Sequence, residues 1–258
     1  MVPVLAFDIE TVPDVEGLRR LHGLDATIPD KEVAEMAFQL RRQATGSDFL
    51  APHLHRVVAI SCALRERDSF KVWSLGGADD AEGELIQRFF DGIDKYTPQL
   101  VSWNGSGFDL PVLNYRGALH GVRAARYWEW GDENRDFRYN NYVNRYHTRH
   151  LDLMDVLGMF QPRNSVALDA IAQLLGFPGK LGLEGARVWE TYLAGGLEEI
   201  RRYCEADVVN TYLVFLRFQQ MRAALSAEQV RGECELIRST LKKSEEPHWK
   251  EFLNRWTS

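Results

Sequence analysis

Apolar and polar positions along the chain form a succession of strand-like and helix-like patterns. The first is an apolar run from Val2 to Phe7, broken only by Pro3 and followed by the turn signal Val12-Pro13-Asp14. An apolar run that ends at a turn is typical of a buried strand. Further strand patterns occur at residues 56–64 and 70–75, joined by a hairpin turn at 65–69, and at residues 99–103 and 150–153.

Helical patterns, with apolar residues three and four positions apart, occupy most of the remaining chain. Pro29-Asp30 begins the first of them, Asp79 or Asp80 is placed to cap the second, and Ser165 is placed to cap a later one. The residues up to Asp25 are expected to be a polar connection. The other helices are predicted near residues 108–119, 188–193 and 197–221, with one or two amphipathic helices in 227–256. This order predicts a mixed α/β sheet with the first strand in its centre.

Residues 123–149 have no clean period and are rich in tyrosine, tryptophan, asparagine and arginine. Linkers are rarely so aromatic, so we expect an ordered excursion from the fold. Aromatic and cationic side chains interleave here, as in proteins that hold single-stranded nucleic acid. Asp132, Glu133 and Asp136 dilute the positive charge. The alternative is that the aromatic residues pack over the sheet, and we expect at least half of them to do so.

Composition narrows the class of protein. The chain has 258 residues, 45% hydrophobic and 26% charged, with a formal net charge of −6. Proteins that coat duplexes are more often basic, so any nucleic-acid contact is expected to be local. The three cysteines form no C-x-x-C pair, which predicts no zinc knuckle, reduced thiols and a cytoplasmic setting. The sequence predicts neither a signal peptide nor a membrane span.

The first candidate for chemistry is the pair Asp8 and Glu10 at the end of the first strand. Side chains alternate across a strand, so the two carboxylates point to the same face. Two carboxylates on a buried strand repel each other and are costly to desolvate, and a bound cation is the usual solution. The alternative is a strand whose polar end emerges into solvent.

The second candidate is Asn104-Gly105-Ser106-Gly107-Phe108-Asp109, which follows the strand at 99–103. Its two glycines permit a tight turn from strand to helix. Asp109 then lies near a helix start, where the helix dipole favours a carboxylate. The alternative role of Asp109 is an N-cap and nothing more.

The third candidate is Tyr203 with Asp207, four positions apart and therefore on one helix face. The alternative places Asp207 at the solvent edge of that face, paired with Arg201 or Arg202. Cys204, beside Tyr203, is expected to face elsewhere and to be inert.

Together the three motifs resemble the DEDD superfamily of 3′–5′ exonucleases, which has a ribonuclease-H-like fold. The resemblance implies an α/β fold, a mixed five-stranded sheet flanked by helices. It is nearest to predicted exonucleases related to the proofreading domain of family-B DNA polymerases. The segment from Arg145 to Leu153 also resembles that group. The histidine branch places histidine five residues before its last aspartate, where this chain has Arg202, so Tyr203 favours the tyrosine branch (DEDDy).

The resemblance covers residues 1–220, with 123–149 as an aromatic and basic insertion, and leaves residues 221–258 as a C-terminal helical extension. It implies a nuclease, a phosphodiester hydrolase, that releases nucleoside 5′-monophosphates from single-stranded DNA 3′ ends by a two-metal mechanism. A role in DNA repair or replication follows, with no partner identified. The implied ligands of two Mg²⁺ or Mn²⁺ ions are Asp8, Glu10, Asp109 and Asp207.

In the same scheme Tyr203 orients the attacking water, and Thr11, Asn104 and Phe108 hold the terminal nucleotide. Arg145 is a candidate phosphate contact within the excursion. Several other polar residues are expected to be structural: Asp152 as a helix cap, and His147 and His150 as scaffold groups.

Two other functions remain open. The same chemistry on RNA ends would make the protein a 3′–5′ exoribonuclease, because recognition of the 2′-hydroxyl depends on close contacts. The other is a catalytically silent nucleic-acid-binding scaffold of a repair complex, against which the four acids and Tyr203 argue.

Overall fold

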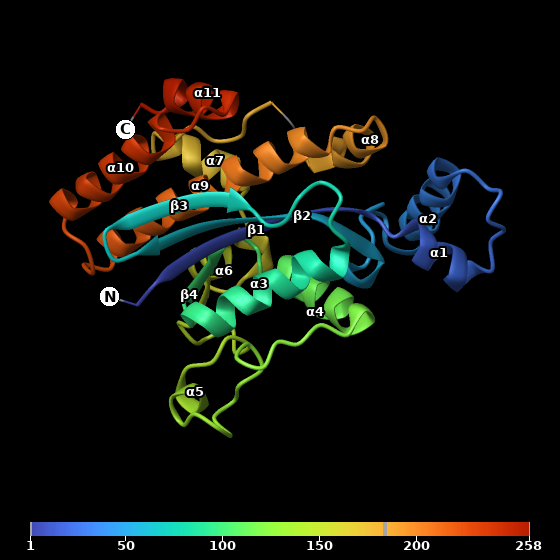
Figure 1. The fold of residues 1–258 in the computed structure, drawn as a ribbon, viewed down its shortest axis with the longest axis horizontal. Coiled ribbons are helices and arrows are strands. Elements are labelled where there is room, and N and C mark those ends of the chain that lie inside the picture. Colours follow the sequence, from blue (N-terminus) through green and yellow to red (C-terminus); the bar gives the residue numbers. More distant parts are fainter. Residues whose placement is uncertain (1, 183–184, 258) are drawn as a thin grey trace.

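A computed structural model describes residues 2–182 and 185–257 and contains one five-stranded sheet (Figure 1). The strand order is β3-β2-β1-β4-β5, so the first strand is central, as predicted. The mixed α/β class is also confirmed, because β1 pairs antiparallel with β2 and parallel with β4. The strands are β1 (Val4–Pro13), β2 (His55–Glu66), β3 (Ser69–Ser74), β4 (Gln99–Ser102) and β5 (His150–Asp152).

Strand β1 extends well beyond its parallel neighbour. It pairs with β4 only from Val4 to Ala6, whereas its pairing with β2 continues to Pro13. The register with β2 shifts between Glu10 and Thr11, which is the signature of a β-bulge. Bulges bend a strand and redirect its side chains, and they are frequent beside active sites. The second half of β1 is therefore open on the β4 side, where a ligand can approach.

Helices cover both faces of the sheet (Figure 1). Within the described residues they are α1 (Val15–His22), α2 (Asp30–Thr45), α3 (Glu82–Tyr96), α4 (Asp109–His120), α5 (Asp136–Tyr139), α6 (Leu153–Leu157), α7 (Leu168–Leu174), α8 (Val188–Leu193), α9 (Leu197–Met221), α10 (Ala227–Lys242) and α11 (Pro247–Arg255). None of these helices is long and apolar enough to cross a bilayer.

Alternation along β1 divides the core between the two faces. Leu5, Phe7 and Ile9 pack with residues of α3 and α4, whereas Ala6 belongs to the cluster that contains α7, α9, α10 and α11. Side chains two residues apart share a face. Asp8 and Glu10 consequently share a face, as predicted, and point with Ala6 toward α9.

Helix boundaries differ from the sequence predictions at three places. Residues 15–22 are not a polar connection but form α1, whose first turn is capped by the Asp14 carboxylate accepting from the Gly17 N–H. Asp80 does not cap α3; its carboxylate accepts from the Gly77 N–H in the preceding turn. Ser165 does not cap α7, which begins two residues later than predicted, at Leu168. In the last two cases the helix starts from extended backbone without a side-chain cap.

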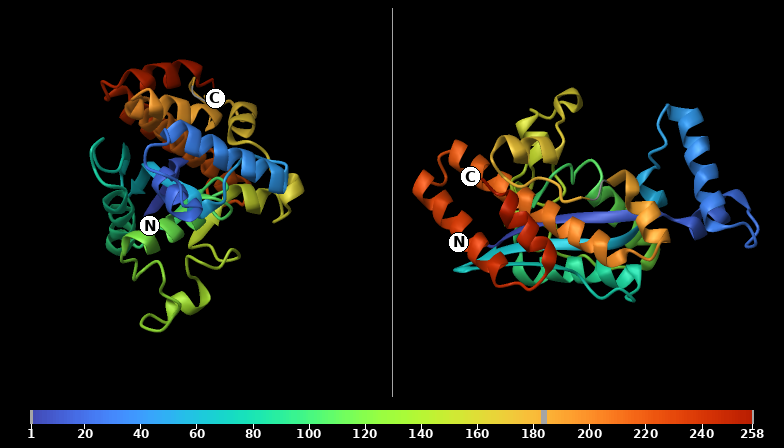
Figure 2. Two further views of the ribbon diagram at one scale, coloured as in Figure 1. Left: turned by 90° about the vertical axis from the view of Figure 1, so that its right-hand side faces the viewer. Right: turned by 90° about the horizontal axis from the view of Figure 1, so that it is seen from above.

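Two segments project from the sheet and its helices. The hairpin of α1 and α2 extends beyond one end of the sheet, and residues 123–149, with α5, extend below α3 and α4 (Figures 1 and 2). The second segment is ordered, as predicted, and buries Tyr127 and Tyr142 in the α3–α4 core. Phe137 is buried with them, but Trp128, Trp130, Tyr139 and Tyr146 are 47–78% exposed, so fewer than half of the segment's seven aromatic residues are packed and the expectation of at least half was wrong.

The last two helices contribute to the main core. Val230 and Ile237 of α10 and Trp249 and Phe252 of α11 are buried in the cluster that includes Leu213 of α9. Helix α10 packs against both α9 and β3, and its Glu233 pairs with Arg65 of β2, while α11 packs against α9 and α10 (Figure 1). Loss of these helices would expose large apolar side chains.

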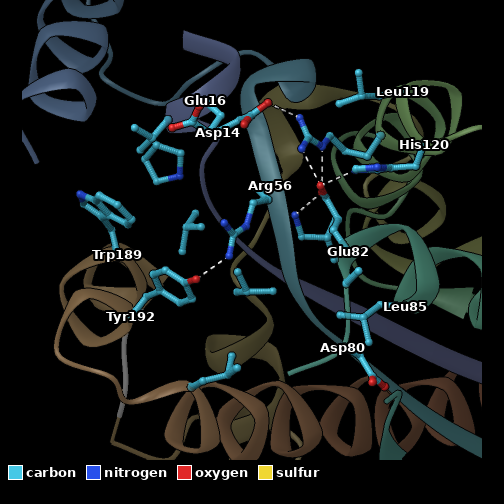
Figure 3. Close-up of a pocket in the computed structure, with 18 of the residues that line it drawn as sticks. Asp14, Glu16, Arg56, Asp80, Glu82, Leu85, Leu119, His120, Trp189 and Tyr192 are labelled. Atoms are coloured by element: carbon cyan, nitrogen blue, oxygen red, sulfur yellow. Dashed lines mark hydrogen bonds and ion pairs between the residues drawn. The ribbon is translucent and has the colours of Figure 1, made fainter. Parts of the chain in front are cut away.

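A buried ion-pair network fixes the far end of β1. Arg116 of α4 is 4% exposed and pairs with both Asp14, which follows β1, and Glu82 of α3. Glu82 also accepts from the Val57 N–H of β2 and pairs with His120. The groups lie along one wall of a hollow of about 650 Å³, where Arg56 donates to the Tyr192 hydroxyl (Figure 3). The polar groups of this wall satisfy one another, so we assign the network to stability.

Replacement of Arg116 by methionine is expected to lower the free energy of unfolding by about 3–5 kcal/mol, because it leaves buried carboxylates unpaired. The measurement is urea unfolding. The matched control is Arg42→Met, which breaks an exposed pair with Asp48 and should cost under about 1 kcal/mol. Equal losses in the two variants would contradict the role given to Arg116.

Candidate metal centre and active site

The backbone brings Asp109 directly beside the strand that carries Asp8 and Glu10. Asp109 is the first residue of α4, and its Oδ1 accepts a hydrogen bond of 3.2 Å from the Ile9 N–H. Ile9 lies between the two acids of β1. Its outward-directed N–H is available because β1 has no β4 partner beyond Ala6. The alternative role as N-cap is therefore wrong: Phe108 holds that position without a side-chain cap, and Asp109 is attached to the centre of the D-x-E motif, 100 positions away.

Helix α9 crosses the same face of the sheet. The thiol of Cys204 donates to the backbone oxygen of Asp8 at 3.4 Å and lies 3.5 Å from its Oδ2. The expectation that Cys204 faces elsewhere was wrong, because the sequence could not show how α9 is rotated against β1. Burial, followed by the charges of Asp8 and Glu10, raises the pKa of the Cys204 thiol, so it stays protonated and acts as a donor.

Tyr203 and Asp207 share a face of α9, as their spacing predicted. The charge of Asp207 raises the pKa of the Tyr203 hydroxyl, so the two groups lie close together. Neither neighbouring arginine forms an ion pair with Asp207: Arg202 pairs with Glu246, and Arg201 donates to backbone oxygens of residues 75 and 76. The alternative of a surface ion pair is therefore wrong.

The four carboxylates form one electrostatic unit. Burial raises the pKa of Asp8 well above its usual value, and the charges of Asp109, Glu10 and Asp207 raise it further, in that order. Burial also raises the pKa of Glu10, and the charges of Asp207 and Asp109 add to the rise. Acids from β1, α4 and α9 thus lie near enough to oppose one another's ionisation.

The other two acids and the tyrosine follow the same pattern. Burial raises the pKa of Asp109 to about 7, with a smaller contribution from the charge of Asp152. Burial raises the pKa of Asp207 to about 6, against the opposing charge of Lys180. Burial, and then the charge of Asp207, raises the pKa of the Tyr203 hydroxyl. Tyr203 is therefore a hydrogen-bond donor and not a base at neutral pH.

The donor set fits divalent cations that prefer oxygen. Asp207 is 7% exposed, and its Oδ1 is a buried atom without a hydrogen-bond partner among the described residues. Such an orphaned acceptor within a group of repelling acids is what a cation would satisfy. Ligand atoms of Asp8, Glu10 and Cys204 lie within 4.8 Å of one another. Carboxylate oxygens suit Mg²⁺ or Mn²⁺.

The turn from β4 to α4 is held in place by Asp152. Its carboxylate caps α6, as predicted, and also accepts from the N–H groups of Asn104 and Ser106. The residue with left-handed backbone is Asn104, at φ 65°, and not either glycine as the sequence suggested. The glycines provide space instead: a Cβ on Gly105 would lie 2.3 Å from the Ser102 hydroxyl.

Sequence reasoning missed Lys180, to which it gave no role. The Lys180 ammonium lies 5.3 Å from the centre of the Tyr203 ring. Burial raises the pKa of Glu10 and Asp207, and the charge of Lys180 opposes that rise at both. The only signal in the sequence was that Lys180 is the single lysine between Lys95 and Lys242 in a chain rich in arginine.

The position of Lys180 is set by two polar side chains. Its backbone N–H donates to Asp169 Oδ1 at 2.7 Å, while the amide of Asn210 forms hydrogen bonds with both the N–H and the carbonyl of Gly179. Gly179 has a φ of 68°, and a Cβ there would meet Asp169 Oδ1 at 2.4 Å. The turn is thus specified by groups from α7 and α9, and it directs a cation toward the acids.

A cleft of about 1000 Å³ opens beside Glu10. It brings together three of the predicted substrate-binding residues, Thr11, Asn104 and Phe108. Its other wall comes from α2, from the loop that follows α2 and from α8, through Phe38, Phe49 and Trp189. Among the described residues that line the cleft, Glu10 is the one member of the four acids.

Arg145 is separated from this cleft by the turn at Asn104. A second hollow, of about 620 Å³, is lined by Arg145, Trp128 and Val143, and it shares Asn104 and Gly107 with the cleft. The Arg145 guanidinium is about half exposed and pairs with Asp155 at 2.8 Å. The histidines nearby are scaffold groups, as predicted: His150 bonds to the Ser102 hydroxyl and His147 accepts from the Asn141 N–H.

Comparison with known proteins identifies one family. A family model described as "Predicted 3'-5' exonuclease related to the exonuclease domain of PolB" matches residues 47–256. The matched range contains Asp109, Tyr203 and Asp207 and extends through α10 and α11, whereas Asp8 and Glu10 precede it. None of the curated proteins compared with the chain matches it.

The acid cluster should make the metal-free protein less stable as the pH rises from about 4 to about 7. Asp109 and Asp207 have folded-state pKa values of about 7 and about 6, above the ordinary value of 3.8. The folded state therefore binds more protons than the unfolded state across this window, and stability is lost as they leave.

The test is the melting temperature in the presence of a chelator. Asp207→Asn should melt above the native protein near pH 8, and the difference should shrink as the pH falls and vanish only below about pH 4, where the aspartate is protonated in both the folded and the unfolded state. Asp91→Asn, which alters an exposed helix residue, is the control and should show no such pH dependence. A native protein more stable than Asp207→Asn near pH 8 would show that the four acids do not repel one another.

Proposed function

Because this chain belongs to the family of predicted 3′–5′ exonucleases related to the exonuclease domain of PolB, we propose that it is a metal-dependent enzyme of that kind. Its substrate is the 3′ end of single-stranded DNA, and its product is a nucleoside 5′-monophosphate. Membership of the family implies a nucleic-acid substrate. The preference for DNA and the two-metal mechanism are parts of the proposal.

One observation carries the proposal. Acids from β1, α4 and α9 are buried together, and each of the three other acids raises the pKa of Asp8. Burial of like charges has no benefit for folding, so a ligand is expected to offset it. The orphaned Oδ1 of Asp207 supports the same conclusion.

Within this site each residue has a distinct role. Asp8, Glu10, Asp109 and Asp207 would hold two Mg²⁺ or Mn²⁺ ions. When bound, such ions lower the pKa of a coordinated water and neutralise charge on the phosphate and leaving oxygen. Tyr203, with its raised pKa, orients the attacking water by a hydrogen bond. The Lys180 ammonium offsets negative charge beside Glu10 and Asp207.

The terminal nucleotide occupies the cleft, and the strand leads away from it over the turn at Asn104. Phe108 and Asn104 hold the terminal nucleotide, since both line the cleft. The preceding nucleotides reach the second hollow, where Trp128 offers an exposed ring and Arg145 a half-exposed guanidinium. Residues 123–149 contain six arginines and four acids, a positive balance in a chain of net charge −6. Stacking with cationic contacts suits single strands.

A metal-titrated nuclease assay on matched single-stranded DNA, duplex DNA and RNA tests the proposal. Digestion of single-stranded DNA from a 3′ end, faster than of the other two, is expected. Faster digestion of RNA would make the protein an exoribonuclease. If no substrate is digested, the remaining function is that of a catalytically silent nucleic-acid-binding scaffold.

Asp8→Ala and Asp207→Ala should each abolish metal-dependent digestion of a DNA oligonucleotide labelled at its 5′ end. Each should also abolish the rise in melting temperature that Mn²⁺ causes in the native protein, because a ligand that binds only the folded state stabilises it. Asp91→Ala, outside the cluster, serves as the control and should retain both properties. Full activity in either cluster variant would overturn the assignment.

Arg145→Gln should raise KM for single-stranded DNA with little change in kcat, because the proposed phosphate contact is remote from the reacting bond. Loss of one such contact should also reduce the slope of log affinity against log salt by about 0.7. Arg138→Gln changes an arginine of the same segment that lines neither hollow, and is the matched control. Identical salt slopes in all three proteins would exclude the contact.

A further inference from the structure

His55, the first residue of β2, connects the α2–β2 loop to the end of β1, the strand that carries Asp8 and Glu10. Its ring is 8% exposed and lies between two groups of the cleft. Nδ1 is 2.9 Å from the Thr11 hydroxyl, and Nε2 is 3.1 Å from the carbonyl oxygen of Leu50. The ring centres of Phe49 and Phe108 lie 5.1 Å and 4.9 Å from that of His55. One buried imidazole thus contacts four residues that line the cleft.

The partners of His55 determine where its proton lies. A carbonyl oxygen only accepts hydrogen bonds, so Nε2 must carry the hydrogen that it shares with Leu50. Burial lowers the pKa of His55, which keeps the ring neutral near pH 7. Nδ1 of a neutral ring with a protonated Nε2 is an acceptor, and the Thr11 hydroxyl must donate to it.

This assignment determines whether Thr11 can donate or accept a hydrogen bond in the cleft. The single hydroxyl proton of Thr11 is directed at His55, so only oxygen lone pairs remain for a ligand. A hydrogen-bond donor on the ligand is therefore selected. On the terminal nucleotide of a DNA strand, the sugar donor is the 3′-hydroxyl.

The same ring supports the apolar wall of the cleft. Phe49 is 57% exposed although it packs against both His55 and Phe108, whose ring centre is 5.2 Å away. The hydrogen bond from His55 to the carbonyl of Leu50 anchors the residue next to Phe49. An exposed ring held in this way within a cleft offers a face for stacking a nucleobase.

We propose that His55 is a positioning residue, acting through Thr11 and Phe49, through which the cleft recognises the 3′-hydroxyl and the base of a terminal nucleotide. This inference rests on the proposed exonuclease function. It assigns a role to two residues, His55 and Phe49, that the sequence motifs do not include.

The first test measures equilibrium binding in Mn²⁺ of two mononucleotides that differ only at the 3′ position. They are thymidine 5′-monophosphate and its 3′-deoxy analogue, and neither has a bond to cleave. Because the 3′-hydroxyl form makes one more neutral hydrogen bond, the native protein should bind it about 2- to 10-fold more tightly than the 3′-deoxy form. Thr11→Val, which removes the acceptor, should bring the ratio of the two affinities, that of the 3′-hydroxyl form over that of the 3′-deoxy form, close to one.

Three variants of His55 separate its two hydrogen bonds. His55→Asn places an amide oxygen near the position of Nδ1 and should retain the ratio. His55→Gln places an amide N–H near that of Nε2; it should keep the Leu50 contact and lose most of the ratio. His55→Phe should lose the ratio and also bind both nucleotides more weakly. His53→Phe changes an exposed neighbour and is the control.

Phe49→Ala should weaken binding of both nucleotides equally, by about fivefold or more, and leave the ratio unchanged. The proposal is overturned if the native protein does not distinguish the two nucleotides. It is also overturned if Thr11→Val and His55→Gln retain the native ratio. A native protein that neither binds nucleotides nor digests DNA would instead overturn the proposed function itself. His55→Asn is the mildest change, and a folded His55→Asn protein shows that the fold tolerates replacement of this histidine.

Discussion

The mutual repulsion of four buried carboxylates is the constraint on which the rest of this structure depends. Acids that raise one another's pKa, as those around Asp8 do, lower the stability of the metal-free fold. Only a framework that gains stability elsewhere can hold them together. Here β1 is the central strand of the sheet, and α9 is a 25-residue helix buried along much of its length. Three of the four acids, Asp8, Glu10 and Asp207, are attached to these two elements, and Asp109 of α4 is joined to β1 by the hydrogen bond from the Ile9 N–H.

The sequence predicted those two elements because both follow simple rules. An apolar run that ends in Asp-x-Glu already indicates a buried strand with two acids on one face. The spacing of Tyr203 and Asp207 places them together on any helix, whatever surrounds it. The short α1 was missed because Asp14, which caps it, also resembles a turn residue, and because eight residues carry too few apolar positions to establish a period.

What the sequence could not provide was the relation between elements that are distant along the chain. The contact of Cys204 with Asp8 depends on the rotation of α9 against β1, which its neighbours in sequence do not determine. Lys180 reaches the acids because Asp169 and Asn210 hold its turn, an arrangement made of three separate segments. The aromatic residues of 123–149 divided into buried and exposed sets according to a tertiary surface that no local pattern describes.

The geometry also explains why chemistry gathers at one end of β1. Parallel strands leave ligand space beyond their carboxyl ends, and β1 continues past β4 by seven residues, from Phe7 to Pro13. In that stretch the Ile9 N–H turns from the sheet to Asp109, and the bulge at Glu10 alters the direction of Thr11. An unpaired strand would be a liability in a structural protein. Here the unpaired edge binds a carboxylate, and the projecting segments 14–50 and 123–149 lie on either side of the turn that faces it. The family match begins only at residue 47, yet Asp109, which lies within it, accepts a hydrogen bond from Ile9 of the strand that precedes it, and Asp207 lies near enough to Glu10 of that strand to raise its pKa. The first ten residues are therefore inseparable from the site that the matched region contains.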